Sequence, residues 1–372
     1  MIKAIRIRIY PNKETQAFFA RQFGACRFVY NHALRLRTDA WLREGRLLKY
    51  HDTAKILTKM KHEEEYAFLQ EVTAQSLQQS LRHLEIAYQK FWHKEARYPQ
   101  FKKRHGKQSF TVPQNFKVRN GKLHLPKCGP VRLQRDAIIA GKVIKVTVSK
   151  TPANRYFASF TAEVLKPKPF KKMKSVIGID LGLTHFLVTS GGEKVASPKF
   201  LARSTRRLRL RQRSLSRREK GSHGRERQRL RVARIHERIS DQRSDFLHKL
   251  SIRLLRENQA IAVESLNVKG MMANRHLSRA ISDQGWSQFL SMLRYKAEWY
   301  GRTILVADRF FPSSKRCSAC GWINEALPLS VRTWSCPSCA SKHERDVNAA
   351  KNILLTTTLG IRESHATGDR KS

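Results

Sequence analysis

Acidic residues are scarce in this sequence. Only 29 Asp and Glu stand against 74 Lys and Arg in 372 residues, so the formal net charge is +45. An excess of this size opposes a compact fold through self-repulsion unless a polyanion offsets it, which argues against a generically basic protein without such a partner. The composition therefore predicts a polyanionic partner, and nucleic acid is the obvious one.

Long hydrophobic runs are also missing. No stretch reaches the roughly 20 apolar residues that a membrane-spanning helix needs, and the arginine-rich segments have no matching apolar face. Residues 1–10 mostly alternate apolar and basic side chains, without the apolar core and cleavage site of a signal peptide. We therefore expect a protein of the prokaryotic cytoplasm, associated with the nucleoid and not with a membrane. Its apolar content of 40% can fill the cores of two or three domains.

Cysteine is rare, and its spacing is informative. Cys26 and Cys128 are isolated, whereas the other four form two CxxC pairs separated by fifteen residues: Cys317, Cys320, Cys336 and Cys339. Four thiolates at this spacing suit a tetrahedral Zn²⁺ in a segment too short to bury its own core. A redox dithiol would instead need a single CxxC beside a thioredoxin-like βαβ unit. We predict a closed, structural zinc site in a ribbon over residues 313–342.

The N-terminal half combines strands with a helical insertion. Residues 2–10 alternate like a strand, apolar side chains keep helical spacing over residues 14–37 and again after Thr73, and short alternating runs separated by Gly and Pro follow from Phe110 to Val164. We predict a small β-barrel from residues 1–10 and 108–168, with a helical lobe over residues 11–107.

Basic and aromatic residues are interleaved between Lys90 and Lys107. Two interpretations are equally supported by this pattern. The rings and cations together suit stacked bases and phosphates. Alternatively, the rings belong to a buried helix face and the cations to its solvated rim.

The C-terminal half alternates strands and helices, which predicts an α/β domain. It follows a Pro/Lys linker at 166–172 and starts with a continuous apolar strand at 175–180. We then expect an arginine-rich helical hairpin from Leu201 to about Glu257, strands at 260–263 and 303–307, and helices at 283–302 and 347–355. Between Leu201 and Arg234 the charged residues of the hairpin are basic except for Glu219 and Glu226. This single sign of charge favours a phosphate-facing role over a merely solvated surface. The predicted domain spans residues 173–312 and 343–356, and residues 357–372 are predicted to be a disordered tail.

Three acids are placed at the ends of these elements. Asp180 closes the first apolar strand and is followed by Gly182, Glu264 closes the strand at 260–263, and Asp346 begins the last helix. Carboxylates at strand ends converge at one rim of a sheet. Two divalent ions about 4 Å apart would offset their repulsion, activate water and stabilise the leaving oxygen of a phosphodiester. Each acid taken alone has a simpler interpretation: Asp180 as a turn cap, Glu264 as the partner of a nearby Arg or Lys, and Asp346 as a helix cap. The three acids together predict a metal-dependent nuclease.

Four segments carry a family resemblance that spans nearly the whole chain: GIDLGLT at 178–184, VESLNVKGM at 263–271, PSSKRCSACG at 312–321 and RDVNAA at 345–350. They closely resemble the OrfB/TnpB proteins of insertion sequences. The resemblance implies a RuvC/RNase H-like nuclease domain with an inserted zinc ribbon, preceded by a β-barrel (wedge) domain that carries a helical recognition lobe. It implies that Asp180, Glu264 and Asp346 bind two Mg²⁺ ions as the catalytic triad.

The same resemblance implies an RNA-guided DNA endonuclease, related to the ancestors of type V CRISPR effectors. Its partners would be a guide RNA from the end of the element and double-stranded target DNA beside a short flanking motif. The chain departs from the family at Glu344, where an aspartate is usual, which leaves the triad intact but affects its fine positioning. Two alternatives stay open: a transposase acting directly on transposon ends, since the fold hosts both reactions, and a non-catalytic nucleic-acid-binding regulator.

Overall fold

The computed structural model describes residues 1–328 and 330–368. The chain divides into two compact units, residues 1–165 and residue 166 onward, close to the boundary expected near residue 170. Each unit has its own sheet and its own hydrophobic core. No helix in these two stretches combines the length and apolar character needed to cross a membrane.

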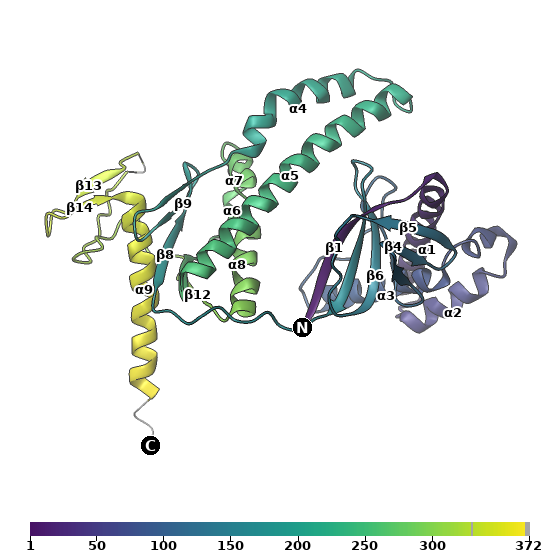
Figure 1. Cartoon of the computed structure of the whole chain (residues 1–372), viewed down its shortest axis with the longest axis horizontal. Helices are drawn as coiled ribbons and strands as arrows, with labels where there is room; N and C mark the ends of the chain where they lie inside the picture. The colour runs from purple at the N-terminus through teal and green to yellow at the C-terminus, as the bar shows by residue number, and fades with distance from the viewer. Residues whose placement is uncertain (329, 369–372) are drawn as a thin grey trace. The chain divides into compact units, whose positions relative to one another are not determined.

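The first unit is built on an antiparallel sheet of seven strands (Figure 1). In spatial order these are β2 (Gln108–Val112), β6 (Lys142–Lys150), β7 (Tyr156–Glu163), β1 (Ile2–Tyr10), β5 (Cys128–Leu133), β4 (Lys122–Leu125) and β3 (Lys117–Arg119). The N-terminal strand joins this sheet as predicted, because β1 pairs with β7 along its length and with β5 at its end. Across the described residues no ladder joins β2 to β3, so the hydrogen bonding is that of an open sheet, where the sequence predicted a barrel.

Helices cover this sheet. They are α1 (Lys13–Glu44), α2 (Tyr50–Met60), the 3-10 helix η1 (Glu64–Leu69) and α3 (Ala74–Trp92). α1 begins where the Asn12 side chain accepts a hydrogen bond from the Thr15 amide, and it ends at Gly45, whose φ of 61° suits glycine. Phe19 and Phe23 of α1 pack against Phe110 of β2 with ring centroids 5.5 and 5.4 Å apart. One apolar core therefore joins the helices to the sheet.

The second unit contains a mixed sheet of five strands, in the order β10 (Lys194–Ala196), β9 (His185–Thr189), β8 (Val176–Leu181), β11 (Ala260–Glu264) and β12 (Thr303–Ala307). β8, β11 and β12 run parallel, whereas β9 and β10 are antiparallel to their neighbours. Strands that alternate with helices along the chain give the α/β domain that the sequence predicted.

Helices lie on both faces of this sheet. They are α4 (Phe200–Ser216), α5 (His223–Glu257), α6 (Val268–Met271), α7 (Ser278–Gln284), α8 (Trp286–Tyr300) and α9 (Arg345–Gly368). α5 and α8 pack on one face around Phe186 and Phe289, and α9 packs on the other through Ile353 (Figure 1). The helix predicted at 283–302 is interrupted at Gly285, where φ is +72°. α9 runs well beyond the predicted end at residue 355; residues 369–372 of the predicted tail lie outside the described residues.

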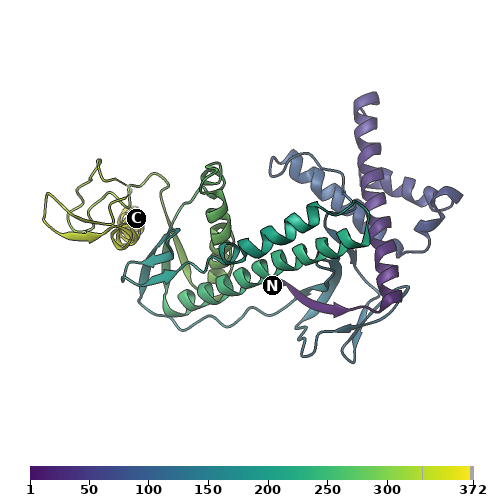
Figure 2. The same ribbon diagram turned by 90° about the horizontal axis from the view of Figure 1, so that it is seen from above.

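The predicted basic hairpin is present as α4 and α5, which lie side by side in both ribbon views (Figures 1 and 2). Its turn contains Gly221, whose φ of +91° disfavours any other residue. A small apolar seam around Leu208, Ile235 and Ile239 holds the two helices together.

The linker between the units is anchored to the second one. The buried Arg302 guanidinium donates hydrogen bonds to the carbonyl oxygens of Leu255 and Lys171, each at 2.9 Å. The Phe170 ring stacks on Tyr300 with centroids 4.3 Å apart. These contacts explain why the second unit begins at the start of the Pro/Lys segment.

Candidate active site and metal centre

Asp180 and Glu264 lie at the same end of two neighbouring strands. β8 and β11 are parallel, with Ile179 opposite Val263, so each acid stands one residue beyond this pair. Neighbouring strands are about 4.8 Å apart. Two acids from distant parts of the sequence are therefore adjacent at the carboxyl ends of their strands.

Both acids face α9. Side chains alternate along a strand, so Asp180 shares a face with Gly178, and Glu264 shares a face with Ala262. Gly178 lies against α9, and Ala262 packs with Ile353 of α9. The carboxylates therefore lie on the α9 face of the sheet, opposite the core formed by α5 and α8.

α9 brings the third acid to the same place. A Cβ atom at Gly178 would come within 2.1 Å of the Ala350 carbonyl oxygen, so only glycine allows the helix to lie this close. Asp346 stands one helical turn before Ala350, in the first turn of α9. Its charge acts on Asp180, because it helps to raise the pKa of that carboxyl group.

The electrostatics of the site indicate a shortage of positive charge. Burial, together with the charges of Glu264 and Asp346, raises the pKa of Asp180 to about 7, although the charge of Arg345 acts to lower it. Burial also raises the pKa of Glu264. Negative charges that are costly to hold in this way are typical of sites that take a cation.

The three carboxylates are nevertheless spread out. Within the described part of the chain, the carboxylate oxygens of the three acids do not all lie within 4.8 Å of one another, whereas the sulfur atoms of the four cysteines do. Asp346 instead places Oδ1 3.6 Å from Nη1 of Arg332. Hard carboxylate oxygens remain the ligands that Mg²⁺ prefers.

The four predicted cysteines do come together. The sulfur atoms of Cys317, Cys320, Cys336 and Cys339 all lie within 4.8 Å of one another. Two pairs, Cys317 with Cys339 and Cys320 with Cys336, have Sγ atoms 3.6 Å apart. Zinc–sulfur bonds of about 2.3 Å require sulfur atoms about 3.8 Å apart at the corners of a tetrahedron. The cluster therefore fits a tetrahedral Zn²⁺.

Neighbouring polar groups support the cysteine cluster. His343 of β14 (Lys342–Glu344) places Nε2 3.0 Å from the Cys317 sulfur. A hydrogen bond with Ser341 lowers the pKa of Cys339 to about 6, which favours the thiolate that a metal needs. Trp334 of β13 (Thr333–Ser335) packs beside His343 with ring centroids 4.9 Å apart.

Two asparagines that the sequence analysis did not single out join the ribbon to α9. Asn348 accepts a hydrogen bond from the Ser318 amide at 3.0 Å and donates one to the Arg316 carbonyl at 2.7 Å. Asn352 donates to the Ser313 carbonyl at 2.8 Å. Both side chains are buried. Their spacing of four residues in an otherwise apolar helix face is the signal that could have identified them.

Glu344, the residue that departs from the family pattern, pairs with Lys194 of β10. The pair links β14, directly before α9, to the edge strand of the sheet. The longer glutamate side chain is therefore used in a contact within this unit.

The basic and aromatic segment at 90–107 contains rings of both kinds. The Phe91 ring is half-buried and packs against Tyr98, which is itself 38% exposed and places its hydroxyl 3.0 Å from that of Tyr88. Trp92 and Phe101 are exposed at 45% and 55%. Each of the two interpretations thus accounts for part of the segment, and Trp92 also packs beside Tyr88 with ring centroids 5.5 Å apart.

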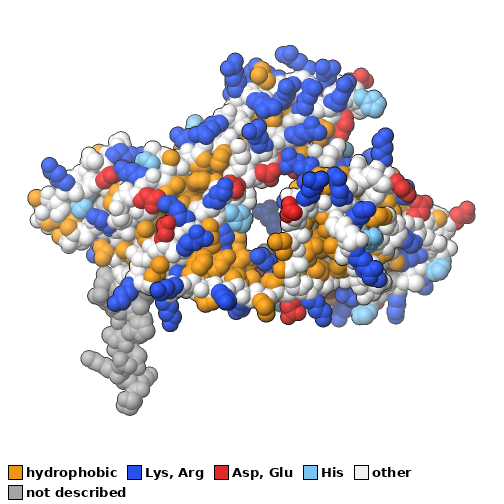
Figure 3. Space-filling view, in the orientation of Figure 1, with side chains coloured by type: hydrophobic (Ala, Val, Ile, Leu, Met, Phe, Trp, Pro, Cys, Tyr) orange, Lys and Arg blue, Asp and Glu red, His pale blue; other side chains and the backbone are white. Residues whose placement is uncertain are grey.

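Cations cover the hairpin. Figure 3 shows Lys and Arg side chains gathered over α4 and α5. Arg206, Arg207, Arg217 and Arg227 are among the exposed ones. Arg225 turns inward instead, and donates to the Leu215 and Arg218 carbonyls at the end of α4. The hairpin therefore offers a surface of fixed positive charge to a polyanion.

Three family models match the chain. The OrfB model described as "Probable transposase" matches residues 159–275, and the model described as "Cas12f1-like, TNB domain" matches residues 286–353. A model described as "Helix-turn-helix domain" matches residues 1–46, although this segment forms β1 and one long helix, α1.

Curated relatives align over almost the whole chain. A Streptomyces pristinaespiralis protein named "Putative RNA-guided DNA endonuclease" is 44% identical over 358 residues, which cover 95% of this chain and 88% of the relative. The Escherichia coli (strain K12) protein "Putative RNA-guided DNA endonuclease InsQ" is 30% identical over 370 residues, covering 95% and 92%. Among solved structures, CasPhi-2 (Cas12j) bound to crRNA aligns over 96% of this chain and 98% of its own, at 9% identity and a TM-score of 0.48.

Proposed function

The chain belongs to the OrfB/TnpB family of insertion-sequence proteins, and from this premise we propose that it is an RNA-guided, metal-dependent DNA endonuclease encoded by a transposable element. It cuts target DNA next to a short flanking motif. The names of its curated relatives support this function. The observation that supports it is the position of Asp180 and Glu264 at adjacent strand ends on the sheet face that α9 covers, with Asp346 in the first turn of α9.

In this proposal the second unit is a RuvC/RNase H-like nuclease domain, formed by residues 173–312 and 343–356, with the zinc ribbon inserted at 313–342. The sheet of the first unit is the wedge domain, and its helices over residues 11–107 are the recognition lobe. We expect the protein in the prokaryotic cytoplasm, associated with the nucleoid. Its partners are a guide RNA from the end of the element and double-stranded DNA.

The three carboxylates hold two Mg²⁺ ions in this proposal. When bound, these ions lower the pKa of water and stabilise the leaving oxygen of the phosphodiester. Asp180 and Glu264 are fixed by neighbouring strands, so they supply the rigid part of the site. Asp346 completes it from α9, whose distance from β8 is set by Gly178. The zinc ion has no catalytic part, because four cysteines leave no open coordination position.

The positive surfaces hold the nucleic acids. The hairpin contacts backbone phosphates of the guide–target duplex or of the displaced strand, with little dependence on sequence. The exposed rings Trp92 and Phe101 stack on unpaired bases beside the lysines of their segment. Sequence choice comes from base pairing with the guide.

The test is to express the protein with its own genomic flanks, sequence the RNA that copurifies, and incubate the complex with a library of matching duplexes. We expect a discrete RNA and magnesium-dependent cutting that requires a match to it. Asp180→Ala, Glu264→Ala and Asp346→Ala should each abolish cutting while duplex binding persists.

Asp245→Asn is a matched control, since it removes an exposed carboxylate of α5 that pairs with Lys249 along the same helix. An alanine variant of the triad that cuts at the wild-type rate would refute the site. A random RNA with intact DNA would refute the endonuclease and favour a non-catalytic binder. Joined transposon ends made by the protein alone would favour a transposase.

A further inference from the structure

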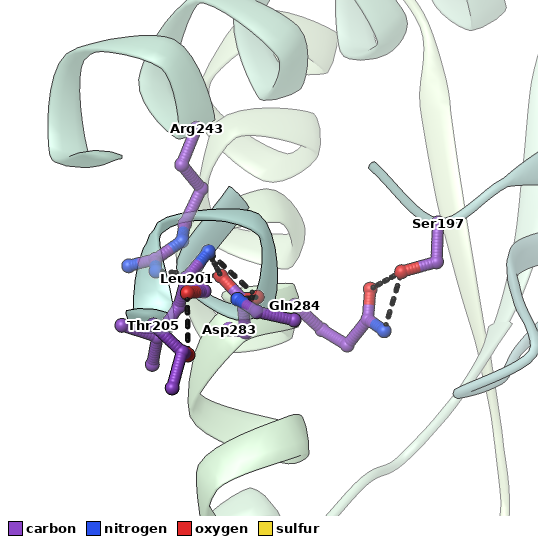
Figure 4. A network of polar contacts seen from close by, with 7 residues as sticks. Ser197, Leu201, Thr205, Arg243, Asp283 and Gln284 are labelled. Atoms are coloured by element: carbon purple, nitrogen blue, oxygen red, sulfur yellow. Dashed lines mark hydrogen bonds and ion pairs between the residues drawn. The ribbon is translucent and has the colours of Figure 1, made fainter. Parts of the chain in front are cut away.

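Asp283 and Gln284 are two adjacent polar residues buried at the base of the hairpin. Their exposed fractions are 9% and 5%, which is rare for an acid and an amide unless they are fully bonded. They end α7, directly before Gly285. Figure 4 shows that the two side chains point in different directions and bind different elements. None of these contacts belongs to the proposed triad.

The Asp283 side chain binds both helices of the hairpin. Its carboxylate accepts hydrogen bonds from the backbone amides of Leu201, at 2.9 and 3.0 Å, and Ala202, at 3.3 Å, in the first turn of α4. It also pairs with Nη2 of Arg243 on α5, at 3.0 Å. A carboxylate suits the positive end of the α4 dipole. One side chain thus joins α4, α5 and α7.

α4 depends on this contact for its start. The residue before it, Lys199, has φ of +47° and, within the described chain, gives no side-chain cap. The first turn of α4 also has no acidic residue of its own. Free amides at a helix start need a partner, and Asp283 supplies it from another element.

Gln284 connects the same point to the loop that follows Asp180. Its Nε2 lies 3.3 Å from the carbonyl oxygen of Leu183, three residues after Asp180, and 2.8 Å from the Ser197 hydroxyl in the segment that enters α4. Gly285 leaves room for Arg243, because a Cβ atom there would come 3.0 Å from Arg243 Cδ. Asp283 therefore holds the base of the hairpin, and the adjacent Gln284 holds the turn between β8 and β9.

We propose that Asp283 and Gln284 are positioning residues, which fix the angle of the basic hairpin relative to the Asp180 strand end so that bound nucleic acid meets the carboxylates in register. This inference rests on the proposed endonuclease function for its catalytic consequence. The apolar seam of the hairpin is small, with Leu208, Ile235 and Ile239 buried in it, so the polar contacts at its base contribute to setting its direction. Small misplacements of a bound substrate cost roughly a hundredfold in rate.

The test compares Asp283→Asn and Arg243→Gln with wild type. Arg243→Gln leaves the cap of α4 in place and releases only α5, so it remains informative if Asp283→Asn folds poorly. Amide hydrogen exchange of residues 200–216 is measured without nucleic acid. Duplex affinity and single-turnover cutting rate are measured with it. We expect faster exchange in the first turn of α4 for Asp283→Asn and near wild-type exchange there for Arg243→Gln. For both variants we expect unchanged affinity within about threefold and cutting roughly ten- to a hundredfold slower.

Asp245→Asn is again the control, because it removes a carboxylate of α5 without touching the clamp, and all three readouts should stay at wild-type values. Unchanged exchange in Asp283→Asn, unchanged cutting in either clamp variant, or an equal loss of affinity and cutting would overturn the inference. If wild type and Asp245→Asn fail to cut, the endonuclease function is refuted. Hydrogen exchange of Asp283→Asn then still decides whether Asp283 holds the start of α4.

Discussion

Gly178 of β8 lies directly against Ala350 of α9, so close that a Cβ atom on Gly178 would come 2.1 Å from the Ala350 carbonyl oxygen and 2.9 Å from Leu354 Cβ. The obstacle is backbone, which cannot turn aside as a long side chain can. This contact fixes the distance between the strand that carries Asp180 and the helix that carries Asp346. The catalytic proposal therefore depends on a residue without a side chain.

Gly178→Ala should separate α9 from the sheet. The extra methyl group forces the helix to shift, which destabilises a packed interface by about 1–3 kcal/mol. The shift displaces Asp346, so the cutting rate should fall by roughly tenfold or more. Thermal unfolding and single-turnover cutting measure the two effects. Gly191→Ala is the control, because its new Cβ meets its nearest neighbour, Thr189 Oγ1, at 3.8 Å. Wild-type cutting by Gly178→Ala would contradict the argument.

The raised pKa of Asp180 makes stability depend on pH. Its pKa is about 7 in the folded protein and ordinary, near 3.8, in the unfolded chain. The folded state therefore binds more protons between these values, and stability is lost as pH rises from about 4 to about 7. Asp180→Asn should remove this loss and be more stable than wild type at pH 8, by about 1–3 kcal/mol.

Chemical denaturation at pH 5, 6, 7 and 8 without added magnesium measures this difference. Metal-depleted buffer is preferable to a chelator, which would also remove zinc. Magnesium should stabilise wild type more at pH 8 than at pH 6, since it binds the charged carboxylate. A constant difference between Asp180→Asn and wild type across this range would show that the folded pKa of Asp180 is ordinary.

Local patterns in the sequence predicted the elements well, and tertiary contacts were harder to foresee. The apolar runs before Asp180 and Glu264 predicted strands that end at the acids, because a buried strand is recognisable from its own residues. The hairpin was similarly visible from its charge. The clamp of Asp283 on Leu201 joins residues 82 positions apart, and no local pattern marks such a pair.

Two differences between the sequence predictions and the structure have simple physical reasons. The apolar periodicity of residues 283–302 continues across Gly285 and therefore predicts a single helix. In the structure the helix is interrupted at Gly285, beside the Arg243 side chain. Whether the first sheet closes into a barrel depends on which strands pair with each other. The alternation of side chains along a single strand does not specify its partner strand. The sequence therefore predicted the strands of this sheet, but the barrel that it predicted is an open sheet among the described residues.

Cys317→Ser and Cys339→Ser should each lower zinc content from about one ion per chain toward none. Each removes one of four thiolates, and the ribbon has little apolar core to replace the metal. Metal analysis and thermal unfolding should show loss of zinc together with earlier melting. Cys128→Ser, in the other unit, should keep its zinc. Full occupancy in both ribbon variants would rule out the site.

Asn348→Ala should loosen the ribbon from α9 without removing zinc. The substitution leaves the Ser318 amide and the Arg316 carbonyl without their partner, and an unsatisfied buried polar group costs about 1–3 kcal/mol. We expect a lower melting temperature with wild-type zinc content. Lys351→Ala, at an exposed position of the same helix, should change neither. Loss of zinc from Asn348→Ala would show that the asparagine shapes the metal site itself.

Arg332→Gln should lower the magnesium concentration needed for half-maximal cutting. The Arg332 guanidinium is 3.6 Å from the Asp346 carboxylate, so it competes with a metal ion for the same negative charge. The arginine side chain is 63% exposed, and an exposed ion pair contributes at most about 1 kcal/mol, which limits the shift to roughly fivefold. Arg309→Gln removes an exposed arginine of the same unit that is not paired with the acids, and it controls for weaker DNA binding. A magnesium requirement that rises, or that falls equally in both variants, would mean that Arg332 does not compete for Asp346.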